Sequence, residues 1–400
     1  MSAPLSGRRS RPAALLEIPI FGATSAAAAV AAGAARLELN AAGSYPAGGT
    51  TPSVAELTAV TGTLSQAQIS KGHQHEEDVR EQQQDQHNAV AVPVRVMIRP
   101  RGPPPPTPSP PSAGHDGGGE EEMHQHRGQE TMLDFVYTPD EVDAMETSIH
   151  ALKPHLDLAR GDGFVFGALR RAAEPDSARR PAPPPLASSA LRADQDINID
   201  DVTCARLVAA ARPFVCVFHR AFDVLVTAAA AGQKRHSVVA GITTAAARSL
   251  PDPVLPLTNL LRRVRDLGFA GILTSGGLGN AVDHVSPTSG DGGHDGFLAE
   301  IMKLADVIGL EIIVGGGVRS VNVAGILRGL RHSTTTAAAL PESVHGDSDE
   351  AGKKRGLGAA EKTPLHPWVH SSCLTTKGSE NVNGDEVTRI IQALGPPKSS

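Results

Sequence analysis

Polar side chains gather at the end of one apolar stretch near the middle of the sequence. The stretch is 214–218, and His219, Arg220 and Asp223 follow it closely. A histidine exchanges protons near neutral pH, an arginine carries a fixed positive charge, and an aspartate supplies a carboxylate. Because a buried parallel strand is apolar along its length and carries chemistry at its carboxyl end, the pattern predicts a strand with a candidate reactive group behind it.

Other apolar stretches carry or end in similar polar side chains, and these define the predicted site. Two arginines can hold a carboxylate or phosphate in a bidentate manner. A glycine turn before a helix, expected here to begin at Ser320, can direct backbone N–H groups at an anion. We interpret Glu17, Glu38, His219 and Asp223 as acid–base residues. The predicted substrate-binding or anion-binding residues are Arg99, Arg101, Arg220, Ser275, Gly315, Gly316, Gly317 and His370.

The elements that must position these residues alternate between strands and helices. Eight strand-like stretches are separated by helical patterns or helix-sized gaps, which predicts a parallel sheet. A count of eight favours a closed α/β barrel, the (β/α)8 or TIM fold, in which the carboxyl ends of all strands meet on one face. The expected strands are 15–18, 36–40, 90–98, 163–169, 214–218, 270–275, 311–314 and 368–372.

Six segments interrupt this pattern with polar, proline-rich, glycine-rich or histidine-rich composition. Such segments cannot bury enough apolar surface to form a packed core, so we predict disordered insertions. Without them roughly 250 residues remain, the usual size of such a barrel. The sequence therefore predicts a single barrel domain over 13–396. The predicted insertions are 69–89, 103–130, 170–195, 228–252, 283–296 and 331–366.

Composition excludes several classes of protein. The net charge of −6 argues against nucleic-acid binding, which needs a basic face. The alanine-rich stretch 26–35 is too short to span a membrane. No apolar segment of signal-peptide length follows the arginines at 8–11, which favours a cytoplasmic protein over a secreted one, with a short mitochondrial presequence as the alternative. Three widely spaced cysteines suit a reducing compartment.

The same residues also have plainer interpretations. Glu17 and Glu38 would neutralise Arg99 and Arg101 as buried ion pairs, and His219 would be a core histidine with satisfied hydrogen bonds. The glycines would serve a tight turn alone. Cys204 and Cys216 would be small core residues. Cys373, just beyond the last predicted strand, is the thiol best placed to meet a metal ion.

The strand ends taken together resemble the CutC copper homeostasis protein family. RPRG at 99–102 and FHRAFD at 218–223 are the most specific segments. The resemblance implies a TIM barrel, a cytosolic location, often a homo-oligomer, and a role in intracellular metal homeostasis with copper ion binding, without an established reaction. The other matching segments are LLEI at 15–18, ARLEL at 35–39, GGTTPS at 48–53, VMI at 96–98, DFVY at 134–137, VFGAL at 165–169, LTSG at 273–276, GGGV at 315–318 and VHSS at 369–372.

Two departures from the family pattern weaken the copper expectation. Members linked to copper binding carry a cysteine after the glutamate of each of the first two strands, where this chain has Pro19 and Asn40. Neither residue supplies the soft ligand that Cu(I) prefers. The family's Gly-Gly-Asp is also interrupted, because Asp134 follows Gly102 only after an insertion.

Three hypotheses remain open from the sequence. The first is a CutC-like protein that binds copper weakly or indirectly. The second is an enzyme of lyase or isomerase type that acts on a small phosphorylated or carboxylated metabolite, and a small anionic ligand suits the polar mouth better than a copper cage. The third is a scaffold barrel without catalysis. Whether the protein is an enzyme is left undecided.

Overall fold

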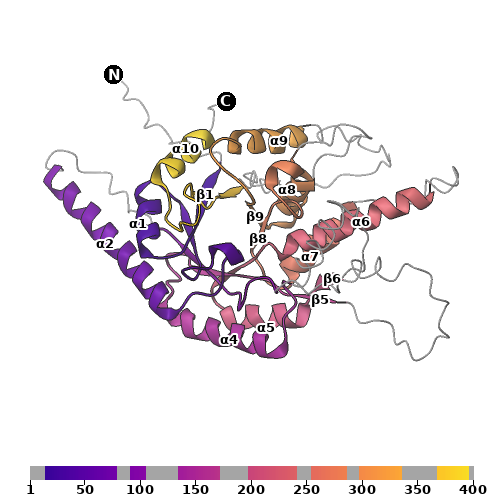
Figure 1. Ribbon diagram of the computed structural model, residues 1–400, viewed down its shortest axis with the longest axis horizontal. Helices are drawn as coiled ribbons and strands as arrows, with labels where there is room; N and C mark the ends of the chain where they lie inside the picture. The colour runs from indigo at the N-terminus through magenta and orange to yellow at the C-terminus, as the bar shows by residue number, and fades with distance from the viewer. Residues whose placement is uncertain are drawn as a thin grey trace, which may run out of the picture.

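Eight parallel strands close into a barrel surrounded by helices (Figure 1). The computed structural model describes residues 14–78, 91–104, 134–171, 197–240, 254–285, 297–335 and 367–395. Around the barrel the strands follow the order β1-β10-β9-β8-β7-β4-β3-β2, and each is parallel to its neighbours. The predicted (β/α)8 fold is confirmed.

The strands are short and mostly buried, as expected where helices cover a parallel sheet. Their sequences, such as VRVM in β3 and GILT in β8, combine β-branched and aliphatic residues. The barrel strands are β1 (Leu15–Ile20), β2 (Arg36–Leu39), β3 (Val94–Met97), β4 (Gly163–Phe166), β7 (Val215–Phe218), β8 (Gly271–Thr274), β9 (Glu311–Val314) and β10 (Trp368–His370).

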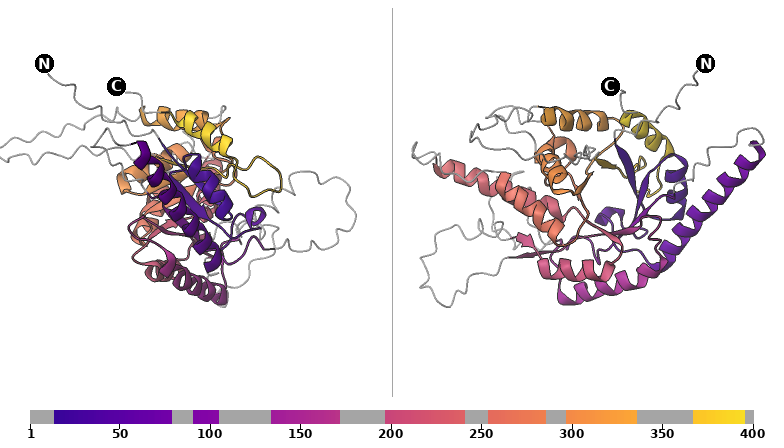
Figure 2. Two further views of the ribbon diagram at one scale, coloured as in Figure 1. Left: turned by 90° about the vertical axis from the view of Figure 1, so that its left-hand side faces the viewer. Right: turned by 180° about the vertical axis from the view of Figure 1, so that it is seen from behind.

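Helices follow the strands on the outside of the barrel, as the views from the side and from behind show (Figure 2). They are α1 (Ala23–Ala31), α2 (Val54–Asp78), α4 (Pro139–Leu152), α5 (Asp201–Ala211), α6 (Ala221–Ala240), α7 (Val254–Asp266), α8 (Phe297–Ile308), α9 (Val323–Thr335) and α10 (Gly384–Leu394). The described residues also form the short 3₁₀ helices η1 (Tyr45–Ala47), η2 (Lys153–His155) and η6 (Ala281–His284). Among the described residues, every helix is too short or too polar to cross a bilayer.

Ser and Thr are good N-caps, so the sequence predicts helix starts at Ser53, Thr138 and Ser320. The structure confirms the first two and corrects the third. Ser53 begins α2, and Thr138 begins α4 in a full capping box with Glu141. Ser320 does not cap a helix, because α9 starts at Val323. The backbone N–H and hydroxyl of Ser320 instead donate to Glu386 on α10, each at 2.8 Å. A carboxylate from the next helix therefore takes the hydrogen bonds expected within the turn.

Four of the predicted insertions overlap helical elements at their first residues. Helix α2 continues to Asp78, α6 to Ala240 and α9 to Thr335, and η6 includes residues 283–284. The last part of α2 is rich in polar residues, among which Gln, Glu and Lys favour helices. The rest of the predicted insertions lies outside the described residues, except for 103–104, 170–171 and 285, which the structure includes.

A small sheet outside the barrel was not predicted. Strands β5 (Leu169–Arg171) and β6 (Ile197–Ile199) pair antiparallel, with Leu169 opposite Ile199. The predicted fourth strand ran through 169, whereas β4 ends at Phe166 and Leu169 begins the separate sheet. The chain therefore leaves the barrel sooner than its apolar composition indicated.

The core consists of two clusters on opposite faces of the barrel sheet, and membership of a cluster shows which face a strand residue is on. A large cluster fills the space between strands and helices. A smaller one lies within the barrel and consists of Met97, Val165, Val217, Leu273 and Ile313, with Trp368 packed against it. Side chains alternate between the two faces along a strand. A residue two positions after a member of the interior cluster therefore also faces the interior, nearer the carboxyl end of its strand.

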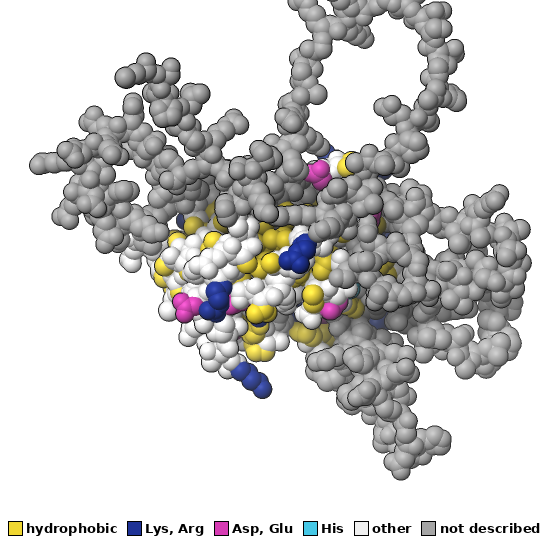
Figure 3. Space-filling model, turned by 90° about the horizontal axis from the view of Figure 1, so that it is seen from above, with side chains coloured by type: hydrophobic (Ala, Val, Ile, Leu, Met, Phe, Trp, Pro, Cys, Tyr) yellow, Lys and Arg dark blue, Asp and Glu magenta, His cyan; other side chains and the backbone are white. Residues whose placement is uncertain are grey.

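The described surface seen from above mixes side-chain types. Lys and Arg side chains lie apart from one another among hydrophobic and other side chains, and those at the left of the view lie beside Asp or Glu side chains (Figure 3).

Candidate functional site at the barrel mouth

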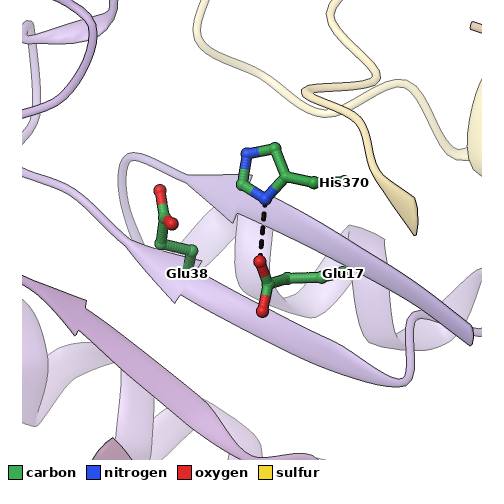
Figure 4. Close-up of side chains that lie close together, drawn as sticks. All are labelled: Glu17, Glu38 and His370. Carbon is green, nitrogen blue, oxygen red and sulfur yellow. Dashed lines mark hydrogen bonds and ion pairs between the residues drawn. The ribbon is translucent and has the colours of Figure 1, made fainter. Parts of the chain in front are cut away.

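Three titratable side chains meet inside the barrel on adjacent strands. Glu17 comes from β1, Glu38 from β2 and His370 from β10 (Figure 4). One potential ligand atom of each lies within 4.8 Å of the others. The ladder places Glu17 beside His370 and Pro19 beside Glu38, so barrel closure brings the first two strands and the last strand together. Within the described residues this is the single group of three or more such side chains with this spacing.

Glu17 is the anionic centre of this cluster. Its Oε1 lies 2.8 Å from Nδ1 of His370, and its Oε2 accepts from Nε of Arg36. Arg36 also donates to Glu311 at 2.8 Å and stacks 3.7 Å from the ring centroid of Trp368. Burial favours the neutral acid, but the charge of Arg36 and the bond to His370 outweigh it and lower the pKa of Glu17 to about 2. Glu17 is therefore ionised.

Glu38 and His370 have environments that favour their protonated forms. Burial, with the negative charge of Glu17 in addition, raises the pKa of Glu38 above its usual value. Burial favours neutral His370, but the charge of Glu38 and the bond and charge of Glu17 outweigh it, so the pKa of His370 is raised. Oε1 of Glu38 accepts from the amide of Asn40 at 3.2 Å. Its Oε2 is buried without a hydrogen-bond partner in the described structure.

The two arginines predicted to clamp an anion are engaged by internal acceptors. Nη2 of Arg99 donates to both carboxylate oxygens of Asp134 at 2.7 Å, and Nη1 donates to the carbonyls of Ala47 and Gly49. Nε of Arg101 donates to Glu141 at 2.5 Å. Asp134 therefore reaches the site in spite of the long segment before it. The expected pairing of Glu17 and Glu38 with these arginines is wrong, since Arg36 neutralises Glu17.

His219 lies within the same barrel end and is 2% exposed. Its Nδ1 accepts from the backbone N–H of Ala221 at 3.3 Å, while its Nε2 is buried without a described partner. Burial, reinforced by the positive charge of Arg99, lowers the pKa of His219 to about 3. A neutral ring that accepts at Nδ1 must carry its proton at Nε2.

Asp223 and its neighbours form a network that ties β7 to β8. The Asp223 carboxylate accepts from Thr274 Oγ1 at 2.5 Å, from the backbone N–H of Ser275 at 3.0 Å and from Nε of Arg220 at 2.7 Å. Arg220 also donates to Oγ of Ser275 at 2.8 Å. These bonds occupy both oxygens of a fully buried carboxylate, so Asp223 positions the rim of the mouth. A catalytic role for it remains a prediction.

The glycine turn after β9 is packed against the loop that follows β8. Gly315 donates to the carbonyl of Thr274, and Gly316 accepts from Ala281, both at 2.9 Å. Gly316 and Gly317 have φ angles of 92° and 66°, which favour glycine. A Cβ at Gly316 would lie 2.9 Å from the Cβ of Ser275. The turn therefore fastens two loops together, and its predicted anion binding remains a prediction.

Cys373 lies apart from the carboxylate and histidine cluster, buried against Ser371 with its Sγ 3.6 Å from the hydroxyl oxygen. Burial raises the pKa of Cys373 to about 11, and the pKa values of Cys204 and Cys216 to about 12. All three are free thiols and buried. Metal binding by Cys373 remains a prediction, and the geometry favours a protonated thiol there.

Sequence reasoning missed the charged residues below the cluster. Arg36, Arg95 and Glu311 are the first or second residues of their strands and lie near the amino end of the barrel. Arg36 stands two residues before Glu38, on the same face of β2, and this spacing was the available signal. Attention to the carboxyl ends of the strands left these residues out.

Fold and site together define a (β/α)8 barrel with a buried carboxylate–histidine cluster at the carboxyl ends of its strands. No family model matches the chain. Curated relatives are the copper homeostasis protein cutC homologues of Mus musculus, at 29% identity over 198 residues, and Homo sapiens, at 27% over 198 residues. Each alignment covers 49% of this chain and 47% of the relative, so the match spans about half of both.

The homologue of Caenorhabditis elegans matches at 25% identity over 194 residues, 48% of this chain and 50% of its own. Among solved structures, a copper homeostasis protein CutC from Streptococcus agalactiae aligns with a TM-score of 0.39 and 19% identity, over 80% of this chain and 95% of that one. The curated relatives confirm the resemblance to the CutC copper homeostasis family over about half of the chain.

Proposed function

We propose that this CutC-like barrel serves copper homeostasis by binding a divalent copper ion at His370 and Glu38, with Glu17 holding the histidine in place. The observation that carries the proposal is the buried Oε2 of Glu38, which has no hydrogen-bond partner in the described structure. One oxygen of the same carboxylate lies within 4.8 Å of a potential ligand atom of each of the other two side chains. A buried carboxylate oxygen without a partner is costly unless something binds it. An ion would satisfy it.

The hydrogen bond between Glu17 and His370 resembles the outer support of many metal sites. Metal-binding histidines commonly donate one ring N–H to a carboxylate, which fixes the ring and leaves the other nitrogen for the ion. Here Nδ1 of His370 faces Glu17 at 2.8 Å, so Nε2 is the nitrogen that binds. Glu17 is also anchored by Arg36, which keeps its carboxylate in a fixed orientation.

The ligand types favour Cu(II) over Cu(I). One imidazole and one or two carboxylates are borderline to hard ligands, and such sites bind Cu(II) most tightly among the common divalent ions. Cu(I) prefers thiolates, and the three cysteines are protonated, buried and outside the cluster. The copper ion would be cargo and not a resident cofactor, as the relation to the copper homeostasis homologues suggests.

Titration of the purified protein with Cu(II), followed by electron paramagnetic resonance, tests the proposal. We expect one site with coupling to a single imidazole nitrogen, and loss of that coupling in His370→Ala. Glu38→Gln should weaken binding strongly, and Glu17→Gln by about 10- to 100-fold through loss of ring orientation. Zn(II) serves as a competing ion.

Glu386→Gln is the matched control, because Glu386 is also buried but lies on α10, where it binds Ser320 and Arg389. It should bind copper as the wild type does. Equal affinity in Glu38→Gln and in the wild type would remove this site from the proposal. Tighter binding of Cu(I) than Cu(II), abolished by Cys373→Ser, would replace it with a thiolate site.

A further inference from the structure

Two buried hydrogen-bond donors at the barrel mouth have no described acceptor. They are Nε of Arg99, which follows β3, and Nε2 of His219, which follows β7. Both residues are almost completely buried, at 4% and 2% exposure. A buried donor without an acceptor costs roughly 1–3 kcal/mol, so such atoms are usually satisfied by water or a ligand.

Backbone register directs both residues to the interior of the barrel. Met97 and Val217 belong to the interior cluster, and Arg99 and His219 each stand two residues further along. The ladder continues past the ends of the strands, with Ile98 donating to Val165 at 2.9 Å and His219 to Phe166 at 3.2 Å. The alternation of faces therefore holds up to the mouth.

Strand β4 separates the two donors and carries no side chain at their level. The register pairs Met97 with Val165 and Phe166 with Phe218. Continued in the same register past the end of β4, Gly167 falls beside Arg99 and His219. A Cβ on Gly167 would lie 3.0 Å from Nδ1 of His219. Glycine thus lets the imidazole ring lie against β4. Phe135 contacts both, with its ring centroid 4.7 Å from His219 and 5.4 Å from the Arg99 guanidinium carbon.

All but one N–H group of Arg99, and the Nδ1 atom of His219, already form hydrogen bonds within the protein. The other nitrogens of Arg99 donate to Ala47, Gly49 and Asp134. The Ala221 N–H occupies Nδ1 of His219, and burial keeps the ring neutral by lowering its pKa to about 3. One N–H from each residue is left, and the charge of Arg99 is balanced by Asp134.

We propose that the barrel mouth binds a small carbonyl compound whose C=O oxygen accepts hydrogen bonds from Nε–H of Arg99 and Nε2–H of His219. A carbonyl oxygen has two lone pairs and no net charge, which fits two donors whose surroundings are charge-balanced. A doubly charged phosphate would enter this buried space without a compensating cation. Preorganised N–H donors of this kind polarise the carbonyl that they bind.

The probe is hydroxyacetone labelled with ¹³C at its carbonyl carbon, observed by NMR. The protein is first treated with a chelator, which removes any bound metal ion. The site does not depend on copper, so failure here and failure of the metal proposal are distinguishable. We expect a concentration-dependent downfield shift of the carbonyl ¹³C resonance in the presence of wild-type protein. Acetate and inorganic phosphate at equal concentration should leave this shift unchanged.

Two substitutions of His219 separate the donor from the structural role of the ring. His219→Asn retains an acceptor near the Nδ1 position and lacks the Nε2–H, so the shift should disappear or the affinity fall about tenfold. His219→Gln retains an N–H near the Nε2 position and should keep most of the shift. Thermal unfolding of both variants verifies that they fold.

Three outcomes would overturn the inference. A wild-type protein that gives no carbonyl shift at about 10 mM probe would mean that the donors serve buried water alone. An unchanged shift in His219→Asn would place the probe elsewhere. Displacement of the probe by acetate or phosphate would identify an anion site in place of a carbonyl site.

Discussion

Nδ1 of His370 lies 2.8 Å from Oε1 of Glu17, and this bond joins the last strand of the barrel to the first. The two residues are also partners in the ladder between β10 and β1. The second carboxylate oxygen of Glu17 faces Arg36. One buried carboxylate therefore binds Arg36 on one side and His370 on the other, and its removal affects both.

Glu17→Gln should destabilise the protein by about 3–5 kcal/mol, since it leaves buried Arg36 without its closest counter-charge. Urea denaturation measures the loss. Glu311→Gln is the matched comparison, because it removes the other carboxylate bound to Arg36. The side chain of Glu311 is 32% exposed. This substitution should cost clearly less. Equal losses in the two variants would show that burial of the pair is not what matters.

The contributions of His219 and Glu17 to stability should decrease as the solution becomes acidic. His219 has a folded pKa of about 3 against 6.5, so its contribution is fully present above pH 6.5 and is lost as the pH falls towards 3. Glu17, at about 2 against 4.5, adds a loss below pH 4.5. The unfolding free energy measured from pH 7 to 4 should fall more steeply for wild type than for His219→Asn. Parallel curves would contradict the assignment to His219.

Asp134→Asn should cost about 3–5 kcal/mol, because Arg99 would keep its charge in a buried place without a carboxylate. Glu141→Gln removes the carboxylate paired with Arg101. Because this ion pair is partly exposed, the loss of unfolding free energy should be at most about 1 kcal/mol. Chemical denaturation of the two variants gives the comparison. A loss in Asp134→Asn as small as that in Glu141→Gln would mean that Asp134 is not the partner of Arg99.

The three thiols should be unreactive in the folded protein. Their pKa values are raised to between about 11 and about 12 by burial, and thiolate is the reactive form. Ellman's reagent at pH 7.5 should label none of them quickly in native protein and all three in denaturant. Rapid labelling of one thiol, lost in Cys373→Ser, would show that Cys373 is more accessible than the structure indicates.

The barrel was predictable from the sequence because its strands are short apolar segments separated by helical patterns or helix-sized gaps. The fifth of these, now β7, was recognised with its following His219 and Asp223. The helix caps at Ser53 and Thr138 involve only residues close in sequence, so the local sequence was sufficient to predict them. Helix α2 beyond residue 68 was missed, because a helix of polar residues has no hydrophobic period to detect.

Pairing inside the barrel could not be derived in the same way. Glu17 and Arg99 were both expected in one mouth, and strand order alone does not say which carboxylate meets which guanidinium. The structure shows Arg36 with Glu17, its partner in the ladder between β1 and β2, and Asp134, from outside the barrel strands, with Arg99. The free N–H of His219 depended on the backbone N–H of Ala221, which no sequence pattern reveals.

The bond between Glu17 and His370 joins residues 353 positions apart. During synthesis, residue 17 leaves the ribosome long before residue 370 is made, and the cluster has no histidine until then. Contacts of such long sequence separation form late and slowly in folding. A nascent chain therefore holds Glu17 and Glu38 without the third member, and any ligand that needs all three can bind only after the ring of strands has closed.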